Sequence, residues 1–496
     1  MKILGINALN HDAAITMIED GEILFAGHSE RYSGIKNDSE LNQPLFSDCF
    51  RYGRPDKVVY YERPWLKKTR QLRAGQYGEV FSRENIPSYY LRDFIGNTPI
   101  EYVQHHTSHA AAGYFTSPYE ESAIVIIDAM GEWETCSIWY AYGSNLEKRY
   151  SVRYPNSLGL WYSAMTQRLG LKPQEDEYIL MGMAGWGTVD EELKDNIRKD
   201  FFKNQPLPIN LSKNLHRGCL DWNPEYYPDD DSEDWKFNIA ANVQSICEEE
   251  IIKVFELARR LVPETDNMCY GGGVALNCVA NSIIAQRYYP KLWILPNPGD
   301  AGSSLGCAAL AFGEHVNWKT PFTGYDIGGR YPRKKVLDEL LLTNIVGVAN
   351  GRAEFGPRAL GNRSLLADPR GKKIKDKVNK IKHRQEFRPF APAVLEEHAH
   401  ELFDMPVKKS QFMQFVAKCK YPKKYPAICH IDGTSRVQTV SKEDNLGFYK
   451  LIKEFYKKTG CPMVLNTSLN IKGQPIVNSY IDATAFSKKY GVKVFS

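Results

Sequence analysis

The chain has 496 residues and a formal net charge of +4, and 43% of its residues are hydrophobic, 25% charged and 12% aromatic. This length allows two or three domains, and the thinly spread charge carries no signature of a nucleic-acid partner. The ten cysteines form no C-x-x-C pair, which indicates a reducing, cytoplasmic setting. The sequence enters a predicted strand directly, so no signal peptide is expected, and no apolar run reaches the ~18 residues that a membrane span needs.

The N-terminal part is predicted to contain two strand–turn–strand units with polar turns. In the first, a buried strand at 2–7 and a polar loop at 7–12 precede a hairpin signalled by Asp20-Gly21. In the second, Ser122–Asp128 and Cys136–Tyr142 flank an acidic turn. Two such units predict a duplicated α/β fold of the actin-like ATPase type, in which the polar loop meets nucleotide phosphate.

A domain boundary is predicted in the second half of the chain. A long amphipathic helix at Phe237–Leu261 leads into a strand at Asn267–Tyr270 and a glycine turn. The pattern then lapses into Pro, Gly and polar residues around Trp318–Gly329, and Ile345–Ala349 is predicted to be a strand of a smaller α/β domain. We therefore expect domains at 1–320 and 326–496.

A metal site is predicted from two histidines and two aspartates. His105 and His109 open a small-residue helix at positions i and i+4, so both imidazoles project from one face. Asp128 and Asp300 each follow an apolar run and precede a glycine, a usual place for a carboxylate at the edge of a sheet. This mixed nitrogen and oxygen set suits iron(II) or manganese better than structural zinc. Packing of a helix face is the alternative for the histidine pair alone.

Three glycine-containing turns are candidate nucleotide contacts. Gly272 and Gly273 allow the backbone to approach a ligand before a helix whose N-terminal amides favour phosphate. Asn277 and Asn281 follow one turn apart and could bind ribose or base. The turn is neither a Walker A sequence nor G-x-G-x-x-G, and a glycine turn without ligand is the alternative. The further candidates are Gly131 and Gly302.

His11 and Asp12 are the candidate catalytic residues. Both lie in the polar loop after the first strand, where His11 could carry a proton or donate a hydrogen bond to a carbonyl. A surface histidine is the alternative reading of His11 taken alone.

An anion pocket is predicted in the C-terminal part, where arginines stand between Gly, Pro and aromatic residues. Such arginines are held in fixed orientations that suit bidentate capture of phosphate, with structural ion pairs as the alternative. Ser468 and Asn470 are expected to face one side of an extended segment. The candidate residues are Arg358, Arg363, Lys382, Arg384, Arg388, Arg436, Ser468 and Asn470.

Together these segments resemble, nearly end to end and in one order, the nodulation-type O-carbamoyltransferase family, which includes cephamycin and aminoglycoside carbamoyltransferases. The matching motifs are Asn10-His11-Asp12-Ala13-Ala14, Ser29-Glu30-Arg31-Tyr32, His105-His106-x-x-His109, Asp128-x-x-Gly131-Glu132, Pro155-Asn156-Ser157-Leu158-Gly159, Leu180-Met181-Gly182-Met183-Ala184, Gly272-Gly273-Val274-Ala275-Leu276-Asn277, Gly299-Asp300-Ala301-Gly302, Glu354-Phe355-Gly356-Pro357-Arg358-Ala359-Leu360-Gly361-Asn362-Arg363-Ser364, Phe387-Arg388-Pro389-Phe390-Ala391-Pro392 and Asn466-Thr467-Ser468-Leu469-Asn470.

The resemblance implies a duplicated actin/hexokinase-like N-terminal domain and a YrdC-like C-terminal domain. It implies that the C-terminal domain joins carbamoyl phosphate to ATP, supplied with Mg²⁺, as carbamoyl adenylate. The carbamoyl group then passes to a hydroxyl of a small molecule in the larger domain, and AMP leaves. By motif, His105, His109, Asp128 and Asp300 would hold iron(II), with manganese as an option. Lys382, Arg388, Arg436, Ser468 and Asn470 would hold carbamoyl phosphate.

Three other functions remain open from the sequence. They are transfer of a threonylcarbamoyl-type group to tRNA, an inactive ATP-binding regulator of the same fold, and simple hydrolysis of carbamoyl phosphate. The acceptor is expected to be a sugar, antibiotic, toxin or nucleotide precursor, contacted from loops such as Gln71–Tyr90 and Asp221–Trp235. A second copy of the chain, as a homodimer, is one further option for a partner.

Overall fold

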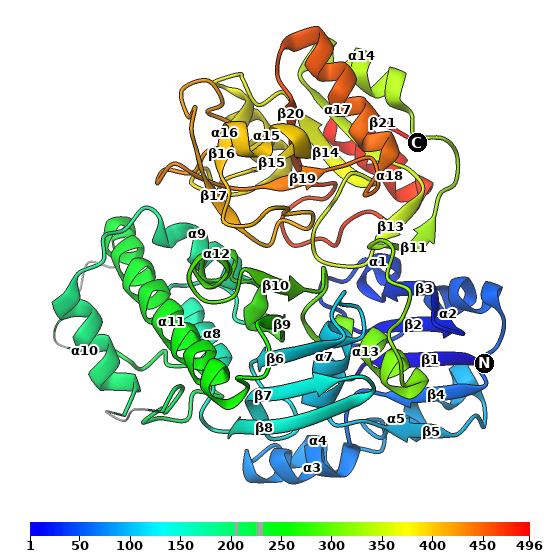
Figure 1. The fold of residues 1–496 in the computed structure, drawn as a ribbon, viewed down its shortest axis with the longest axis vertical. Helices are drawn as coiled ribbons and strands as arrows, with labels where there is room; N and C mark the ends of the chain where they lie inside the picture. The colour runs from blue at the N-terminus through cyan, green and yellow to red at the C-terminus, as the bar shows by residue number, and fades with distance from the viewer. Residues whose placement is uncertain (204–206, 225, 227–231) are drawn as a thin grey trace. The chain divides into compact units, whose positions relative to one another are not determined.

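The structure, a computed structural model, describes residues 1–203, 207–224, 226 and 232–496 (Figure 1). The acidic run Asp229-Asp230-Asp231 in the predicted acceptor loop lies outside the described residues. Two compact units are present, and each is built from separated stretches of chain. The first consists of Met1–Ala26, Ser39–Ala280 and Arg287–Trp318, and the second of Gly27–Asp38, Asn281–Gln286 and Lys319–Ser496.

Two five-stranded sheets of the same design form the first unit. In the first sheet the strand order is β3-β2-β1-β4-β5, with β1 antiparallel to β2 and parallel to β4. In the second sheet the order is β8-β7-β6-β9-β10, with β6 antiparallel to β7 and parallel to β9. The strands are β1 (Lys2–Asn7), β2 (Ala14–Glu19), β3 (Glu22–His28), β4 (Lys57–Tyr60), β5 (Ile100–Tyr102), β6 (Glu121–Ile127), β7 (Glu134–Tyr142), β8 (Asn145–Arg153), β9 (Asn267–Gly271) and β10 (Lys291–Ile294).

This repeated strand order confirms the predicted internal duplication and defines an actin/hexokinase-like α/β fold. The hairpin prediction is also confirmed, because Asp20 and Gly21 join β2 to β3 with φ values of 48° and 83°. Positive φ at both central residues is what a two-residue type I′ turn requires, and it matches the twist of the flanking strands.

Helices α7 and α13 pack against each other and contact different sheets. Helix α13 lies against β1 and β2, whereas α7 lies against β6 and β9. The helices of this unit are α2 (Gln43–Cys49), η1 (Phe50–Tyr52), α3 (Pro64–Arg73), α4 (Tyr77–Phe81), α5 (Pro87–Tyr90), α6 (Arg92–Ile95), α7 (His105–Tyr114), α8 (Leu158–Arg168), α9 (Glu177–Ala184), α10 (Glu191–Phe201), α11 (Glu233–Leu261), η2 (Gly273–Leu276) and α13 (Asp300–Phe312), while α12 (Cys278–Arg287) straddles the division. None of the described helices is long and apolar enough to cross a bilayer.

The second unit is built on a six-stranded sheet of order β19-β15-β20-β14-β12-β21. Helix α17 (Leu446–Thr459) covers it with Phe448, Leu451, Ile452 and Phe455, which are fully buried. The other elements are α1 (Glu30–Ser33), β11 (Phe322–Asp326), α14 (Arg333–Thr343), β12 (Ile345–Ala349), β13 (Arg352–Glu354), β14 (Arg363–Ala367), α15 (Ile374–Lys382), β15 (Ala391–Leu395), η3 (Glu396–His398), α16 (Ala399–Leu402), β16 (Phe403–Asp404), β17 (Val416–Cys419), β18 (Thr434–Arg436), β19 (Gln438–Val440), β20 (Met463–Ser468), α18 (Tyr480–Tyr490) and β21 (Val494–Phe495).

Candidate metal centre and anion pocket

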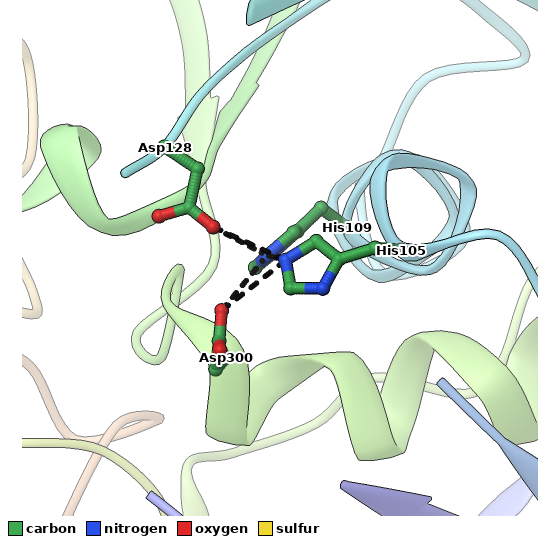
Figure 2. Close-up of side chains that lie close together, drawn as sticks. All are labelled: His105, His109, Asp128 and Asp300. Carbon is green, nitrogen blue, oxygen red and sulfur yellow. Dashed lines mark hydrogen bonds and ion pairs between the residues drawn. The ribbon is translucent and has the colours of Figure 1, made fainter. Parts of the chain in front are cut away.

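Four buried side chains converge on one point in the first unit: His105, His109, Asp128 and Asp300 (Figure 2). One ligand atom from each lies within 4.8 Å of all the others. His105 Nε2 is 3.1 Å from His109 Nε2 and 3.1 Å from Asp128 Oδ2. His109 Nε2 is 3.3 Å from Asp300 Oδ1. Side chains predicted from three distant segments are therefore brought together.

Helix starts and strand ends place these ligands. His105 and Asp300 are the first residues of α7 and α13, and Asp128 directly follows β6. Gly306 permits the close approach of the two helices, because a Cβ there would meet the carbonyl oxygen of Ser108 at 1.9 Å. Small residues at a helix crossing thus set the distance between the histidine pair and Asp300.

Opposite charges in the centre stabilise each other, so the carboxylates raise the pKa of the histidines and the histidines lower that of the carboxylates. Burial alone would lower the pKa of His105, but Asp300 and the contacts with Asp128 outweigh it and raise this pKa well above its usual value. Burial also opposes ionisation of Asp128, yet the two histidines hold its pKa well below the usual range. By contrast, burial followed by the charges of His105 and His109 lowers the pKa of His106. The neutral form of His106 is therefore favoured. This ring lies outside the centre, with its Nδ1 2.7 Å from Ser137 Oγ.

The donor set fits a metal ion. Asp300 Oδ1 is buried, and it faces His105 Nε2 at 3.4 Å and His109 Nε2 at 3.3 Å. Two imidazole nitrogens facing each other at 3.1 Å, with a carboxylate oxygen on either side, are well explained by a shared cation. Two nitrogens and two carboxylate oxygens are ligands of the kind that iron(II) and manganese accept.

Acidic residues that the sequence analysis did not assign surround the centre. Glu132 accepts hydrogen bonds from the backbone N–H of His105 and of Arg63, both at 2.9 Å. Glu62 Oε1 lies 3.3 Å from His105 Nδ1. Glu62 stands just past strand β4, so its place at the end of an apolar run is a signal that could have found it, although no glycine follows it as one follows Asp128.

His11 and Asp12 lie beside Asp300. His11 Nε2 is 3.6 Å from Asp300 Oδ2, and His11 Nδ1 is 3.0 Å from Asp12 Oδ2. Burial lowers the pKa of His11, but the carboxylates of Asp300 and Asp12 outweigh it and raise this pKa to about 10. These two carboxylates favour the protonated form of His11, which suits hydrogen-bond donation.

The glycine turn touches the same centre. Gly272 has φ 88° and would place a Cβ 2.2 Å from the Ile127 carbonyl oxygen, while the N–H of Gly273 donates to Asp128 Oδ1 at 3.1 Å. The predicted helix start here is the short 3₁₀ helix η2. Gly131 lies against His105, and Gly302 packs tightly under the carbonyl of Asn297.

The two candidate asparagines have different partners. The side-chain amide of Asn277 exchanges hydrogen bonds with Gln244 at 3.0 and 3.2 Å. Asn281 belongs to the second unit and donates to the Gln414 carbonyl at 3.1 Å. The structure therefore does not gather them around one point as it does the four metal-type ligands.

Lys382 is the centre of the predicted anion pocket in the second unit. It is 5% exposed, and its Nζ donates to Ser468 O at 2.5 Å, Asn470 Oδ1 at 2.8 Å and Asn470 O at 3.0 Å. Burial, then the charges of Arg384 and Arg388, lower the pKa of Lys382 well below its usual value. A buried amine held by neutral acceptors and surrounded by cations is a favourable place for an anion.

Strand pairing gathers further candidates at this edge of the sheet. Strand β20 ends at Ser468, opposite Ser364 at the start of β14, and β19 begins two residues after Arg436. The Nε of Arg436 is buried without a hydrogen-bond partner in the described chain. Arg384 donates to Asn379 Oδ1 and to the Pro389 carbonyl and stacks on Phe390. Arg358 and Arg388 are half-buried.

Arg363 has a different role from that expected. It is fully buried, and its guanidinium donates to the backbone carbonyls of Asn478, Asn350, Asn362, Tyr325 and Gly351 at 2.9–3.1 Å. These five bonds use all five N–H groups of an arginine. We therefore assign Arg363 to the frame that supports the pocket rather than to its ligand.

These features define a two-unit α/β protein with an actin/hexokinase-like first unit and a metal-type centre. Family models agree with this arrangement: one described as Carbamoyltransferase N-terminus matches residues 89–309, and one described as Carbamoyltransferase C-terminus matches residues 337–496. The chain belongs to the carbamoyltransferase family, and it is a carbamoyltransferase.

Individual relatives extend over nearly the whole chain. Nodulation protein NolNO of Sinorhizobium fredii is 30% identical over 96% of this chain and 76% of its own length. The 3'-hydroxymethylcephem-O-carbamoyltransferase of Amycolatopsis lactamdurans is 26% identical over 97% of this chain and 95% of its own. Among solved structures, T. kodakarensis HypF aligns with 63% of this chain and 47% of its own at a TM-score of 0.36 and 12% identity.

Proposed function

We propose that the protein is an ATP-dependent O-carbamoyltransferase that makes carbamoyl adenylate in its second unit and uses it at the metal centre of its first unit. The observation that carries the proposal is the convergence of His105, His109, Asp128 and Asp300 in a member of the carbamoyltransferase family. A relative named for carbamoylation of a hydroxymethyl group supports oxygen as the accepting atom.

Activation is assigned to the second unit, for which we propose a YrdC-like fold. A carbamate is a poor electrophile because its nitrogen donates into the carbonyl group, so a good leaving group must be attached. In the proposed sequence, water splits carbamoyl phosphate into carbamate and phosphate. A carbamate oxygen then attacks the α-phosphorus of ATP, and pyrophosphate leaves. Lys382, Arg388 and Arg436 would neutralise the phosphate, with Ser468 and Asn470 orienting it.

Transfer is assigned to the first unit. The acceptor hydroxyl oxygen attacks the carbamoyl carbon, and the bond from that carbon to AMP breaks. His11 would donate a hydrogen bond to the carbonyl oxygen, and Asp12 would take the hydroxyl proton. A divalent ion bound by His105, His109, Asp128 and Asp300 would supply positive charge to offset the charge that develops on departing AMP. The glycine turn at Gly272 and Gly273 would face the nucleotide phosphate.

The test is mass spectrometry of the products formed from Mg-ATP and carbamoyl phosphate, without an acceptor and then with a panel of hydroxyl compounds. The protein is first reconstituted with iron(II) or manganese. We expect carbamoyl adenylate, or AMP and pyrophosphate, only when both substrates are present. A carbamoylated product should appear with the right acceptor.

Two variants separate the half-reactions. Lys382→Met should abolish formation of the adenylate, whereas Asp300→Asn should leave that step intact and abolish transfer to the acceptor. If neither the wild type nor any metal-loaded form turns over nucleotide, the two-step mechanism is wrong. Release of phosphate without formation of AMP, when ATP and carbamoyl phosphate are both present, would instead indicate simple hydrolysis of carbamoyl phosphate.

A further inference from the structure

We propose that Glu62 and Lys67 are positioning residues of the metal centre. Glu62 orients the ligand His105 from behind, and Lys67 ties Glu62 to the loop that carries His11. This inference rests on the proposed metal site, and it adds two residues that no motif of the family resemblance contains.

Glu62 contacts the side of His105 that faces away from the other ligands. Figure 2 shows one ring nitrogen of His105 directed at the carboxylates and the other directed away from them. That second nitrogen, Nδ1, lies 3.3 Å from Glu62 Oε1, and Glu62 is 1% exposed. An Nδ1–H that donates to Glu62 leaves the lone pair on Nε2, the atom 3.1 Å from Asp128 Oδ2. A carboxylate behind a metal-binding histidine fixes its tautomer and raises its basicity in this way.

Lys67 compensates the buried charge of Glu62. Its Nζ lies 2.8 Å from Glu62 Oε2, and the Lys67 side chain is 11% exposed. Pro64 begins helix α3 two residues after Glu62, so the helical turn directs Lys67 back toward Glu62. The ion pair therefore anchors Oε2 of Glu62 and leaves Oε1 facing His105 Nδ1.

Lys67 also reaches the loop that carries His11. Its Nζ donates to the carbonyl of Leu9 at 3.1 Å. Leu9 has a positive φ of 66°, and the next two residues face the centre: Asn10 Nδ2 donates to Asp300 Oδ2 at 3.4 Å, and His11 Nε2 lies 3.6 Å from the same atom. One ammonium group therefore holds two elements at the centre, the carboxylate behind His105 and the loop beside Asp300.

The matched control is Glu134, a second buried carboxylate of the same unit. Glu134 pairs with Lys148 Nζ at 2.6 and 2.8 Å and accepts a hydrogen bond from the Gln104 amide at 2.9 Å. It is 4% exposed. Its side chain has the same chemistry and a similar lysine partner, but it bonds to neither metal-type histidine.

The experiment measures the affinity for manganese(II), followed through the electron paramagnetic resonance signal of the free ion. It compares the wild type, Glu62→Gln, Lys67→Met and Glu134→Gln. A glutamine amide at 62 can donate as well as accept, so it no longer selects the Nδ1–H tautomer. We expect Glu62→Gln to weaken binding by about 10–100-fold, the usual range for the partner of a metal-binding histidine. Lys67→Met should also weaken manganese binding, and Glu134→Gln should leave the affinity unchanged.

Three results would overturn the inference. If Glu62→Gln binds manganese as tightly as the wild type, Glu62 does not position His105, and the metal centre itself stands. If Glu134→Gln loses as much affinity, the loss reflects the removal of any buried carboxylate. If the wild type binds neither manganese nor iron(II), the proposed metal centre fails together with the inference. Thermal denaturation of each variant establishes that it is folded.

Discussion

The first residues of two helices, His105 of α7 and Asp300 of α13, meet with 3.4 Å between Nε2 and Oδ1. Their separation is set by the crossing of the helices, where Gly306 of α13 lies under the Ser108 carbonyl of α7. The metal-type centre therefore depends on a glycine that takes no part in its chemistry.

Gly306→Ala should weaken both folding and metal binding. The new Cβ would lie 1.9 Å from a backbone oxygen, so the helices must separate. We expect a loss of about 1–3 kcal/mol in the free energy of unfolding, the usual range for overpacking. Gly182→Ala in helix α9 is the control, because its Cβ meets nothing within 4 Å. Denaturant unfolding and manganese titration measure both effects, and equal behaviour of the two variants would contradict this account of Gly306.

Arg363→Lys should destabilise the second unit without a direct effect on anion recognition. The substitution leaves several buried backbone carbonyls without their donor. We expect about 3–5 kcal/mol of lost stability, as for other broken buried charged networks. Arg333→Lys serves as control, because Arg333 forms a half-exposed ion pair with Glu454 worth at most about 1 kcal/mol. If Arg363→Lys is as stable as the wild type, the hydrogen bonds from Arg363 to these carbonyls do not stabilise the second unit.

Binding of phosphate to the second unit should be accompanied by proton uptake. Burial and the charges of Arg384 and Arg388 lower the pKa of Lys382, and a bound dianion would raise it again. At a pH between the pKa of Lys382 in the free protein and its pKa in the complex, Lys382 must therefore gain a proton on binding. Calorimetric titration with inorganic phosphate in two buffers of different ionisation enthalpy measures this uptake. Lys382→Met should abolish it, and proton-neutral binding by the wild type would contradict the prediction.

Stability should fall with rising pH because of Glu248. Burial raises its pKa to about 7 in the folded protein, above its ordinary value of 4.5, although the amide of Gln244 donates to it at 2.8 Å. Because the folded state binds this proton more tightly than the unfolded state, the contribution is complete below pH 4.5 and is lost as the pH rises through 7. Between pH 4 and pH 8, the free energy of unfolding of Glu248→Gln should rise by about 1–3 kcal/mol relative to that of the wild type. If the free energies of unfolding of the two proteins change equally with pH, the prediction is wrong.

Local sequence rules were sufficient for several features of this protein. Asp20-Gly21 determined the first hairpin because few other residues accept positive φ at both positions. The spacing of His105 and His109 determined that both rings share a helix face. Asp128 could be selected because a carboxylate that ends an apolar strand lies at a sheet edge. The repeated strand–turn–strand pattern likewise determined the duplicated fold.

Tertiary structure alone decided which of these residues act together. Glu62 became a neighbour of His105 only through the pairing of β4 with β5, which precedes helix α7. The buried carbonyls around Arg363 turned a candidate phosphate ligand into a structural residue. Asn277 and Asn281, one turn apart in the sequence, found partners in different units. The reason is physical: periodicity determines which face a side chain takes, but the partners on that face come from segments that only packing brings close.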